Sequence, residues 1–189
     1  HPIALDLIRR SGCLIAAPSA NTSGRPSPTE AAHVAEDLSG KIAMIIDGGP
    51  VGIGIESTII DLTEDTPMVL RPGYITPQML SKVLGKEVVI DPGIIAADDT
   101  RKPKAPGMKY KHYAPKADMA IVDGTRKHVI AKINELVASH RDDGKKIAVI
   151  ATEETKQFYD ADVVLSMGSR ADEDSIAHEL YRILRDCDE

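Results

Sequence analysis

The sequence predicts an α/β protein in two parts, because the order of helical and strand-like segments changes partway along the chain. In the first part, alternating apolar segments joined by short turns are mixed with helical segments, which predicts a twisted mixed sheet. In the second part, strand-like and helical segments alternate, which is typical of a parallel sheet in a small Rossmann-like layer. The change falls within residues 93–117, so the expected parts are residues 1–92 and 118–189, joined by a connector.

The helices of the first part are predicted from residues that favour helix starts and stops. Each has a proline or a polar cap near its start and a glycine just after its end. The start signals are Pro2, a capping box formed by Ser27, Pro28 and Glu30, and the pair Thr76–Pro77; the stop signals are Gly12, Gly40 and Gly85. We therefore expect helices over residues 2–10, from about 28 to 39, and over 77–84.

The strands are predicted from short apolar or alternating runs bounded by turn residues. The expected strands of the first part are residues 13–17, 41–47, 57–62, 67–71 and 87–91, and those of the second part are 119–124, 146–152 and 162–168. Helices are expected between and after the strands of the second part, over residues 126–140, near 153–159 and from about 173.

The composition describes an ordinary globular protein, with 42% hydrophobic and 28% charged residues among 189. No apolar run approaches the roughly 20 residues that a membrane span needs, and the first residues lack the pattern of a signal peptide. Cys13 and Cys187 lie in no metal-binding or redox spacing, which predicts free thiols. We therefore expect a cytoplasmic protein that does not associate with membranes.

The charge of the chain is unevenly distributed. Its net charge is −6, yet residues 93–117 carry six basic and two acidic side chains. Within them, "APGMKYKHYAPK" (105–116) holds Tyr110, Tyr113 and four basic residues, with no acid. A basic strip between acidic bodies suggests an anionic ligand, either phosphate or nucleic acid. A solvated loop that balances charge remains the alternative.

Three loops carry polar groups suited to binding. "APSANTSGRPSP" (17–28) offers hydroxyls, an amide and Arg25, which can bind phosphate or hold a metal-bound water, although such a loop can also be a simple turn. "GGPVGIGIEST" (48–58) permits close backbone approach or forms a flexible hairpin loop; it is no P-loop, since no Gly-Lys-Ser/Thr follows. Arg71 in "LRPG" ends a strand and either projects over a cleft or is exposed.

The sequence shows no arrangement typical of nucleophilic catalysis or of a metal cluster. His33 and His178 lie in helical patterns and are expected at the surface, and His128 and His140 flank a helix without metal-ligand spacing. What remains is a phosphate-handling site that forms no covalent intermediate, so no residue is assigned as a catalytic nucleophile, acid or base.

Four segments together carry a family resemblance. "APSANTSGRPSPT", "GIESTIIDL", "LRPG" and "APGMKYKHYAP" occur in the order and spacing of the threonylcarbamoyl-AMP synthase family, the two-domain form of the YrdC-type fold, and the chain resembles that family from end to end. The resemblance implies that residues 1–92 are the carboxyl half of a YrdC-like domain with a positive cleft. It further implies that residues 93–117 cross this cleft and that residues 118–189 are a Rossmann-like domain.

The resemblance also implies that the chain is a piece of a longer protein. The family has roughly as much chain again before the position of His1, carrying further basic residues that face ATP and threonine, and it continues past Glu189. The chain itself starts at a helix without Met and ends with helical propensity still running. We therefore expect that residues 1–189 hold half of the active-site wall and have little activity alone.

The activity implied by the resemblance is nucleotidyl transfer. The family makes threonylcarbamoyl-AMP and pyrophosphate from L-threonine, bicarbonate and ATP, with Mg²⁺ accompanying ATP. The carbamate oxygen of N-carboxythreonine attacks the α-phosphate, so the protein positions anions and neutralises charge. A downstream transferase complex then passes the product to an adenosine beside the anticodon of certain tRNAs.

The resemblance carries over to individual residues. The implied ATP-binding residues are Ser19, Asn21, Ser27, Arg71 and Tyr113, with Asn21 supporting phosphate or metal; the implied threonine-binding positions are the backbone of Ala17 and Ser57. Lys109 and His112 are expected to act with Tyr113 as a lid, because carbamates and acyl-adenylates decompose in water and the site must close.

Two other functions stay open at this stage. One is a non-catalytic RNA-binding module, although the acidic balance of both parts argues against stable nucleic-acid binding. The other is a carbamoyltransferase relative of the same fold, which would use carbamoyl phosphate. Steep salt-dependent binding to tRNA without ATP would favour the first alternative, and threonine-dependent release of pyrophosphate distinguishes the expected enzyme from the second.

Overall fold

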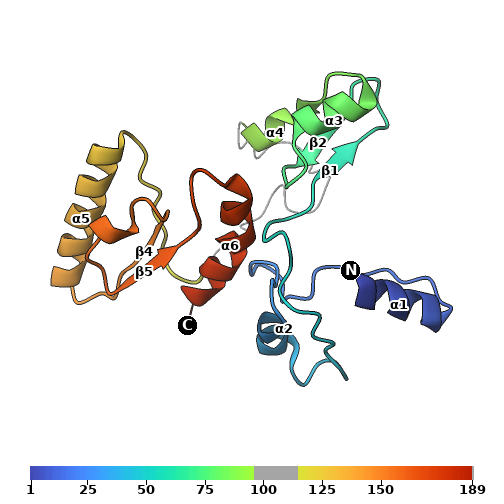
Figure 1. Ribbon diagram of the computed structural model, residues 1–189, viewed down its shortest axis with the longest axis horizontal. Coiled ribbons are helices and arrows are strands. Elements are labelled where there is room, and N and C mark those ends of the chain that lie inside the picture. The colour runs from blue at the N-terminus through green and yellow to red at the C-terminus, as the bar shows by residue number, and fades with distance from the viewer. Residues whose placement is uncertain (96–114, 189) are drawn as a thin grey trace.

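The structure, a computed structural model, describes residues 1–95 and 115–188 and has an α/β architecture (Figure 1). Its helices are α1 (Pro2–Ser11), α2 (Ala31–Leu38), α3 (Pro77–Leu84), α4 (Pro92–Ile95), α5 (Arg126–Asp142) and α6 (Glu173–Asp186), with a 3₁₀ turn η1 (Lys156–Phe158). Its strands are β1 (Ile59–Asp61), β2 (Met68–Arg71), β3 (Val89–Ile90), β4 (Ala148–Ala151) and β5 (Val163–Ser166).

The first sheet is mixed, as predicted. Strand β2 is central: it pairs antiparallel with β1, with Ile60 opposite Val69, and parallel with β3, with Val69 opposite Ile90. Val69 is fully buried and Leu70 nearly so, which makes β2 the core of this sheet. Helix α3 returns the chain from β2 to β3; it begins directly after Thr76 and ends directly before Gly85, as these capping residues predict.

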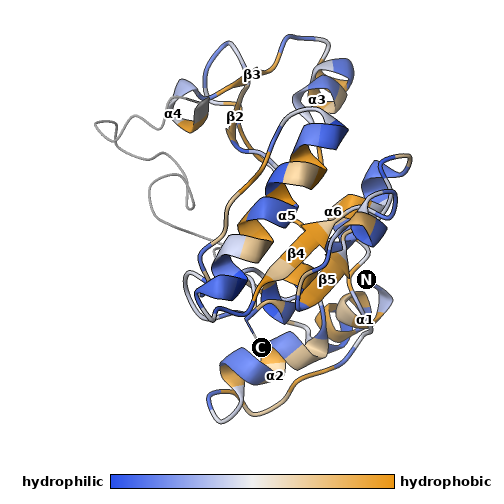
Figure 2. Cartoon of the chain, turned by 90° about the vertical axis from the view of Figure 1, so that its left-hand side faces the viewer, coloured by the Kyte–Doolittle hydropathy of each residue, from blue (hydrophilic) through white to orange (hydrophobic). Residues whose placement is uncertain are grey.

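The second sheet is a parallel pair, which confirms the expected Rossmann-like layer. Strands β4 and β5 pair in register from Ala148 with Val163 to Ala151 with Ser166. Helix α5 packs against β4 through Val137, and Figure 2 shows the apolar strands beside this helix. Figure 1 shows α6 between this layer and the first part of the chain.

Three predicted strands are wrong. Residues 13–17, 41–47 and 119–124 are not strands, and Leu14, Met44 and Ile121 within them are exposed. Their apolar patterns fit a strand, but a strand exists only when a neighbour satisfies its backbone groups. Within the described ranges, no segment pairs with these three.

The predicted capping box and the predicted exposure of His33 are also wrong. Helix α2 begins at Ala31, after Glu30, and Ser27 instead donates its hydroxyl hydrogen bond to Glu56. His33 is buried, and its Nδ1 accepts a hydrogen bond from the amide of Thr29 at 3.2 Å. Burial, aided by the nearby Arg185 cation, lowers the pKa of His33.

The structure also places the two cysteines and His178. Cys13 and Cys187 are free thiols, as expected, and burial raises the pKa of Cys187. His178 is partly exposed and pairs with Glu179 at 2.7 Å.

No helix within residues 1–95 and 115–188 combines the length and apolar character that crossing a bilayer requires.

Candidate functional site

Three of the predicted loops meet through a chain of polar contacts. The hydroxyl of Ser27 donates to the carboxylate of Glu56, which forms an ion pair with Arg71 at 3.4 Å. Arg71 in turn donates hydrogen bonds to the carbonyl oxygen of Ser57 at 3.0 Å and to its hydroxyl at 2.9 Å. Ser27, Arg71 and Ser57, which the family resemblance assigns to one site, are thus brought together by Glu56, a residue that the sequence analysis did not single out.

The sheet explains why Arg71 and Ser57 are neighbours. Arg71 is the last residue of β2 and lies opposite Ile59, the first residue of the antiparallel strand β1. The turn after β2 then passes very close to the chain before β1, because a Cβ at Gly73 would overlap the backbone between Glu56 and Thr58. The glycine of "LRPG" is therefore required for space, and it lets the two segments pack backbone to backbone.

Asn21 organises the first loop and leaves one acceptor available. Its amide nitrogen donates to the carbonyl oxygens of Thr22 at 2.9 Å and of Arg25 at 3.2 Å, which fixes the orientation of the amide. Its Oδ1 is buried and has no hydrogen-bond partner among the described residues. Such an oxygen can accept a ligand hydroxyl or coordinate a hard cation. Ala17 and Ser19, which precede this turn, are exposed.

Two carboxylates of α2, those of Glu36 and Asp37, bind residues of the same loop. Asp37 accepts hydrogen bonds from the backbone amide of Thr22 at 2.9 Å and from the guanidinium of Arg25. Arg25 also pairs with Glu36 at 2.7 Å. Burial opposes ionisation of Asp37, but hydrogen bonds from Arg185 and Thr22 outweigh it, so the pKa of Asp37 is lowered. Arg25, a predicted polar group of the loop, is therefore committed to structure.

Helix α6 of the second part contacts all three loops. Arg185 donates to the carbonyl oxygen of Pro26 at 2.6 Å. The peptide of Gly54 bonds to the backbone of α6, donating to Ala177 at 3.1 Å and accepting from Tyr181 at 3.2 Å. The hydroxyl of Tyr74, which follows "LRPG", bonds to Asp174, and this carboxylate raises the pKa of Tyr74. Sequence reasoning missed these contacts, because they join residues 100 or more positions apart.

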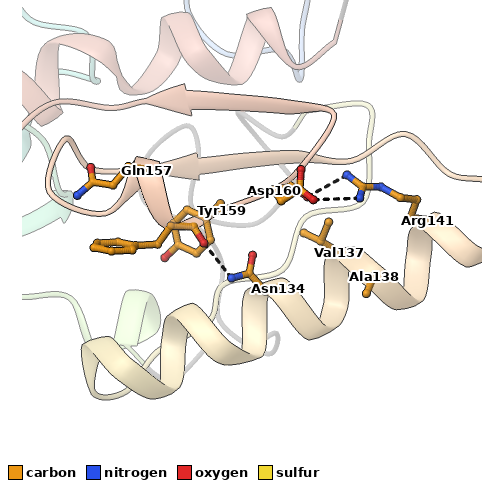
Figure 3. A pocket seen from close by; sticks show the side chains of 8 residues that line it. Asn134, Val137, Ala138, Arg141, Gln157, Tyr159 and Asp160 are labelled. Atoms are coloured by element: carbon orange, nitrogen blue, oxygen red, sulfur yellow. Dashed lines mark hydrogen bonds and ion pairs between the residues drawn. The ribbon is translucent and has the colours of Figure 1, made fainter.

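A separate groove of about 270 Å³ lies in the second part, between α5 and the segment around η1 (Figure 3). Its lining residues are Asn134, Val137, Ala138, Arg141, Gln157, Phe158, Tyr159 and Asp160. Two of its polar side chains bridge its walls: Asn134 donates to the carbonyl of Phe158 at 2.9 Å and Arg141 to that of Asp160 at 2.9 Å. Among the residues that the structure describes, no predicted site residue lines this groove, and these two polar side chains are bonded to backbone carbonyls of its opposite wall.

The remaining expected site residues, Tyr113, Lys109 and His112, lie outside the described residues, so their expected role as a lid stays a prediction. Within residues 1–95 and 115–188, no group of three or more His, Cys, Asp or Glu side chains is placed to hold a metal ion.

The fold and the loop cluster together define a class of protein. Hydroxyl and guanidinium donors from three loops lie within one chain of contacts, and donors of this kind can bind and orient anionic groups. Residues 75–189 match the family model described as threonylcarbamoyl-AMP synthase, C-terminal domain, and residues 1–73 match the family described as Telomere recombination. The chain belongs to the threonylcarbamoyl-AMP synthase family.

The similarity to individual relatives runs through the whole chain. Over 189 residues it is 49% identical to the threonylcarbamoyl-AMP synthase of Bacillus subtilis (strain 168) and 51% identical to that of Pyrococcus abyssi (strain GE5 / Orsay). It also resembles the crystal structure of P. abyssi Sua5 complexed with L-threonine, with a TM-score of 0.87 and 48% identity over 100% of this chain. The chain spans 53% of the length of each of these relatives.

Proposed function

We propose that the protein makes threonylcarbamoyl-AMP and pyrophosphate from L-threonine, bicarbonate and ATP, and that its product supplies a tRNA-modifying transferase complex. The observation that carries this proposal is the chain of contacts from Ser27 through Glu56 and Arg71 to Ser57, which joins the three loops in one site. Family membership supports it, as does the relative whose crystal structure contains L-threonine.

The proposed reaction needs no nucleophile from the protein. A carbamate oxygen of N-carboxythreonine forms a bond to the α-phosphorus of ATP, the bond from that phosphorus to the bridging oxygen breaks, and pyrophosphate leaves with the electron pair. Arg71 would neutralise phosphate charge, with Ser27 donating a hydrogen bond beside it. Ser57, held by Arg71, would contact threonine. Glu56 contacts both Arg71 and the hydroxyl of Ser27, so nucleotide would displace this carboxylate from both groups.

Asn21 is suited to hold the metal that accompanies ATP. Its Oδ1, which is buried and has no hydrogen-bond partner within residues 1–95 and 115–188, is a neutral oxygen of the kind that Mg²⁺ accepts. The bound ion would offset negative charge on the phosphates. The residues of this chain would still do the orienting, through the hydroxyl of Ser27 and the guanidinium of Arg71.

We further propose that residues 1–189 supply only part of this site. Many large apolar side chains of the first 53 residues are exposed, which is unusual for a finished domain surface. They include Ile3, Leu5, Leu7, Ile8, Leu14, Ile15, Ile42, Met44 and Ile46. The additional length of the relatives offers a partner that would cover them and complete the site.

Detection of the product tests the proposed function. Full-length protein incubated with ATP, bicarbonate, Mg²⁺ and L-threonine should form threonylcarbamoyl-AMP, measured by mass spectrometry. Omitting threonine, or replacing bicarbonate with carbamoyl phosphate, should abolish product. Product formed from carbamoyl phosphate would instead identify a carbamoyltransferase and would overturn the proposal.

A further inference from the structure

Arg185 joins the last helix of the chain to the first loop of the candidate site. Its side chain is only 2% exposed, although it belongs to a helix of the second part. Each of its three guanidinium nitrogens donates to a residue of the first part. Nε and one terminal nitrogen donate to the carbonyl of Pro26 at 3.0 and 2.6 Å, and the terminal nitrogens reach Asp37 at 2.9 and 3.4 Å.

Asp37 passes this contact on to the loop that carries Asn21 and Ser27. Its side chain is completely buried, and Oδ2, which accepts from Arg185 at 2.9 Å, also accepts the amide of Thr22 at 2.9 Å. Arg185 thus holds Pro26 directly and Thr22 through Asp37. These two points lie on either side of the turn that Asn21 closes by donating to the carbonyls of Thr22 and Arg25.

The arrangement is conditional on both charges. A buried carboxylate is stable only when it is paired and hydrogen-bonded, and removing one member of a buried pair leaves the other uncompensated. Without Arg185, Asp37 would keep Arg25 and Thr22 as donors, but the carbonyl of Pro26 would lose its bonds from α6. At its carboxyl side, the loop from 21 to 27 would then lose its backbone contact with α6 and keep the side-chain bond of Ser27 to Glu56.

We propose that Arg185 is a positioning residue that orders the loop of residues 21–27 for ligand binding, so that the docking of α6 sets the affinity of the site. The ordering of the loop by Arg185 is independent of the proposed function, whereas its effect on catalysis rests on that function. The contacts of Gly54 and Tyr74 with α6 support it, because they hold the same helix against the other two loops.

Arg182 provides a matched control, because it lies one turn before Arg185 on the same helix. Its ion pairs are with Glu179 and with Asp186, at 2.6 Å for the latter, and both partners belong to α6. Substitution of Arg182 therefore removes a charge from α6 without removing a hydrogen bond to the first loop. Arg182→Met and Arg185→Met are equal changes in composition with different expected consequences.

Hydrogen exchange of the full-length protein without ligands tests the ordering directly. Arg185→Met should speed exchange of the peptide covering residues 20–27 by about tenfold, whereas Arg182→Met should leave it unchanged and neither should affect α5. If Arg185→Met does not fold, Arg185→Lys provides the test, because one ammonium cannot bond to Pro26 and to both oxygens of Asp37. The Arg185→Lys protein should exchange the amides of residues 20–27 about threefold faster than the wild-type protein. Unchanged exchange in a folded Arg185 variant would overturn the proposal.

Kinetics distinguish positioning from a general loss of stability. If the competent loop becomes about tenfold less populated, the KM for ATP should rise about tenfold, while kcat stays within about twofold because saturating ligand reorders the loop. Arg185→Lys should recover part of the KM. A lower kcat at unchanged KM would indicate loss of folded enzyme and would contradict positioning. Failure of the wild-type protein to turn over would refute the proposed function, while the exchange result would still decide the role of Arg185.

Discussion

Arg71 donates to both the carbonyl oxygen and the hydroxyl of Ser57, at 3.0 and 2.9 Å, so two residues from separate motifs form one unit. The hydroxyl of Ser57 is therefore held in place by the guanidinium that we propose for phosphate binding. The family resemblance implies that Arg71 binds ATP and that Ser57 binds threonine, and the contact between them predicts that the two ligands are coupled through this pair.

Substitution of Arg71 or Ser57 should affect the binding of ATP and of threonine to different degrees, because the two residues contact each other. In full-length protein, Arg71→Ala should weaken ATP binding by about 1.5–3 kcal/mol, because a charge-assisted contact is lost. Ser57→Ala should mainly weaken threonine binding. Isothermal titration calorimetry measures both, and the opposite partition would show that the two motifs are wrongly assigned.

A double-mutant cycle tests the coupling itself. The combined variant should lose less threonine affinity than the sum of the single variants, with an interaction energy of about 0.5–3 kcal/mol, because Arg71→Ala already releases Ser57. Strict additivity would mean that the hydrogen bond between them does not position the hydroxyl.

Gly54 should be far less tolerant of a side chain than Gly52. A Cβ at Gly54 would overlap the carbonyl of His178 in α6, whereas a Cβ at Gly52 meets nothing within 4 Å. Gly54→Ala should therefore reduce the free energy of unfolding by about 1–3 kcal/mol, and Gly52→Ala should change it by less than about 0.5 kcal/mol. Urea unfolding measures both, and equal effects would argue against the close approach of this loop to α6.

Glu154 should make stability sensitive to acid. Hydrogen bonds from Ser169 and Thr152 and from backbone amides lower the pKa of Glu154 from 4.5 to about 2. Because the pKa is lower in the folded state, the stabilisation is present above about pH 4.5 and is lost as pH falls toward 2. Unfolding measured across this range should show that loss.

Removal of a donor should reverse the shift. Ser169→Ala should raise the pKa of Glu154, measured by carbon NMR of its carboxylate, because the hydroxyl at 2.6 Å is gone. Ser166→Ala is the control, since that hydroxyl donates to Glu153 instead. Titration of Glu154 at the same pH in all three proteins would show that Ser169 is not the cause.

Much of the secondary structure could be predicted because its signals are local. Pro2 and Gly12 correctly bound α1, and Thr76 and Gly85 correctly bound α3, since capping depends on residues within one turn. The parallel pairing of β4 with β5 also follows from local alternation of strand and helix.

The features that sequence reasoning missed all depend on distant partners. The segments 13–17 and 41–47 have strand-like patterns, but no pattern says which neighbour pairs with them. Ser27 reads as a helix cap because Glu30 follows it, yet its hydroxyl turns to Glu56, 29 positions away. Asp37 and Arg185 are buried by a contact across 148 positions, which no local sequence pattern indicates.

Residues 1–189 alone should show little or no threonine-dependent pyrophosphate release. They expose apolar side chains from Ile3 to Ile53, and they span 53% of their relatives, so part of the site wall is expected to come from further chain. A phosphate assay on this chain and on full-length protein makes the comparison. Equal turnover by the two would show that the described loops suffice.

The most direct test of the central claim compares two arginines in the full-length protein by threonine-dependent release of pyrophosphate from ATP. Arg71 lies in the three-loop site, and Arg141 lines the groove beside α5, where it donates to the carbonyl of Asp160. Arg71→Ala should reduce kcat/KM at least tenfold, equivalent to a loss of about 1.4 kcal/mol in transition-state stabilisation, while Arg141→Ala should retain wild-type turnover. Full activity of Arg71→Ala, or release of pyrophosphate that does not depend on threonine, would contradict the proposed site and reaction.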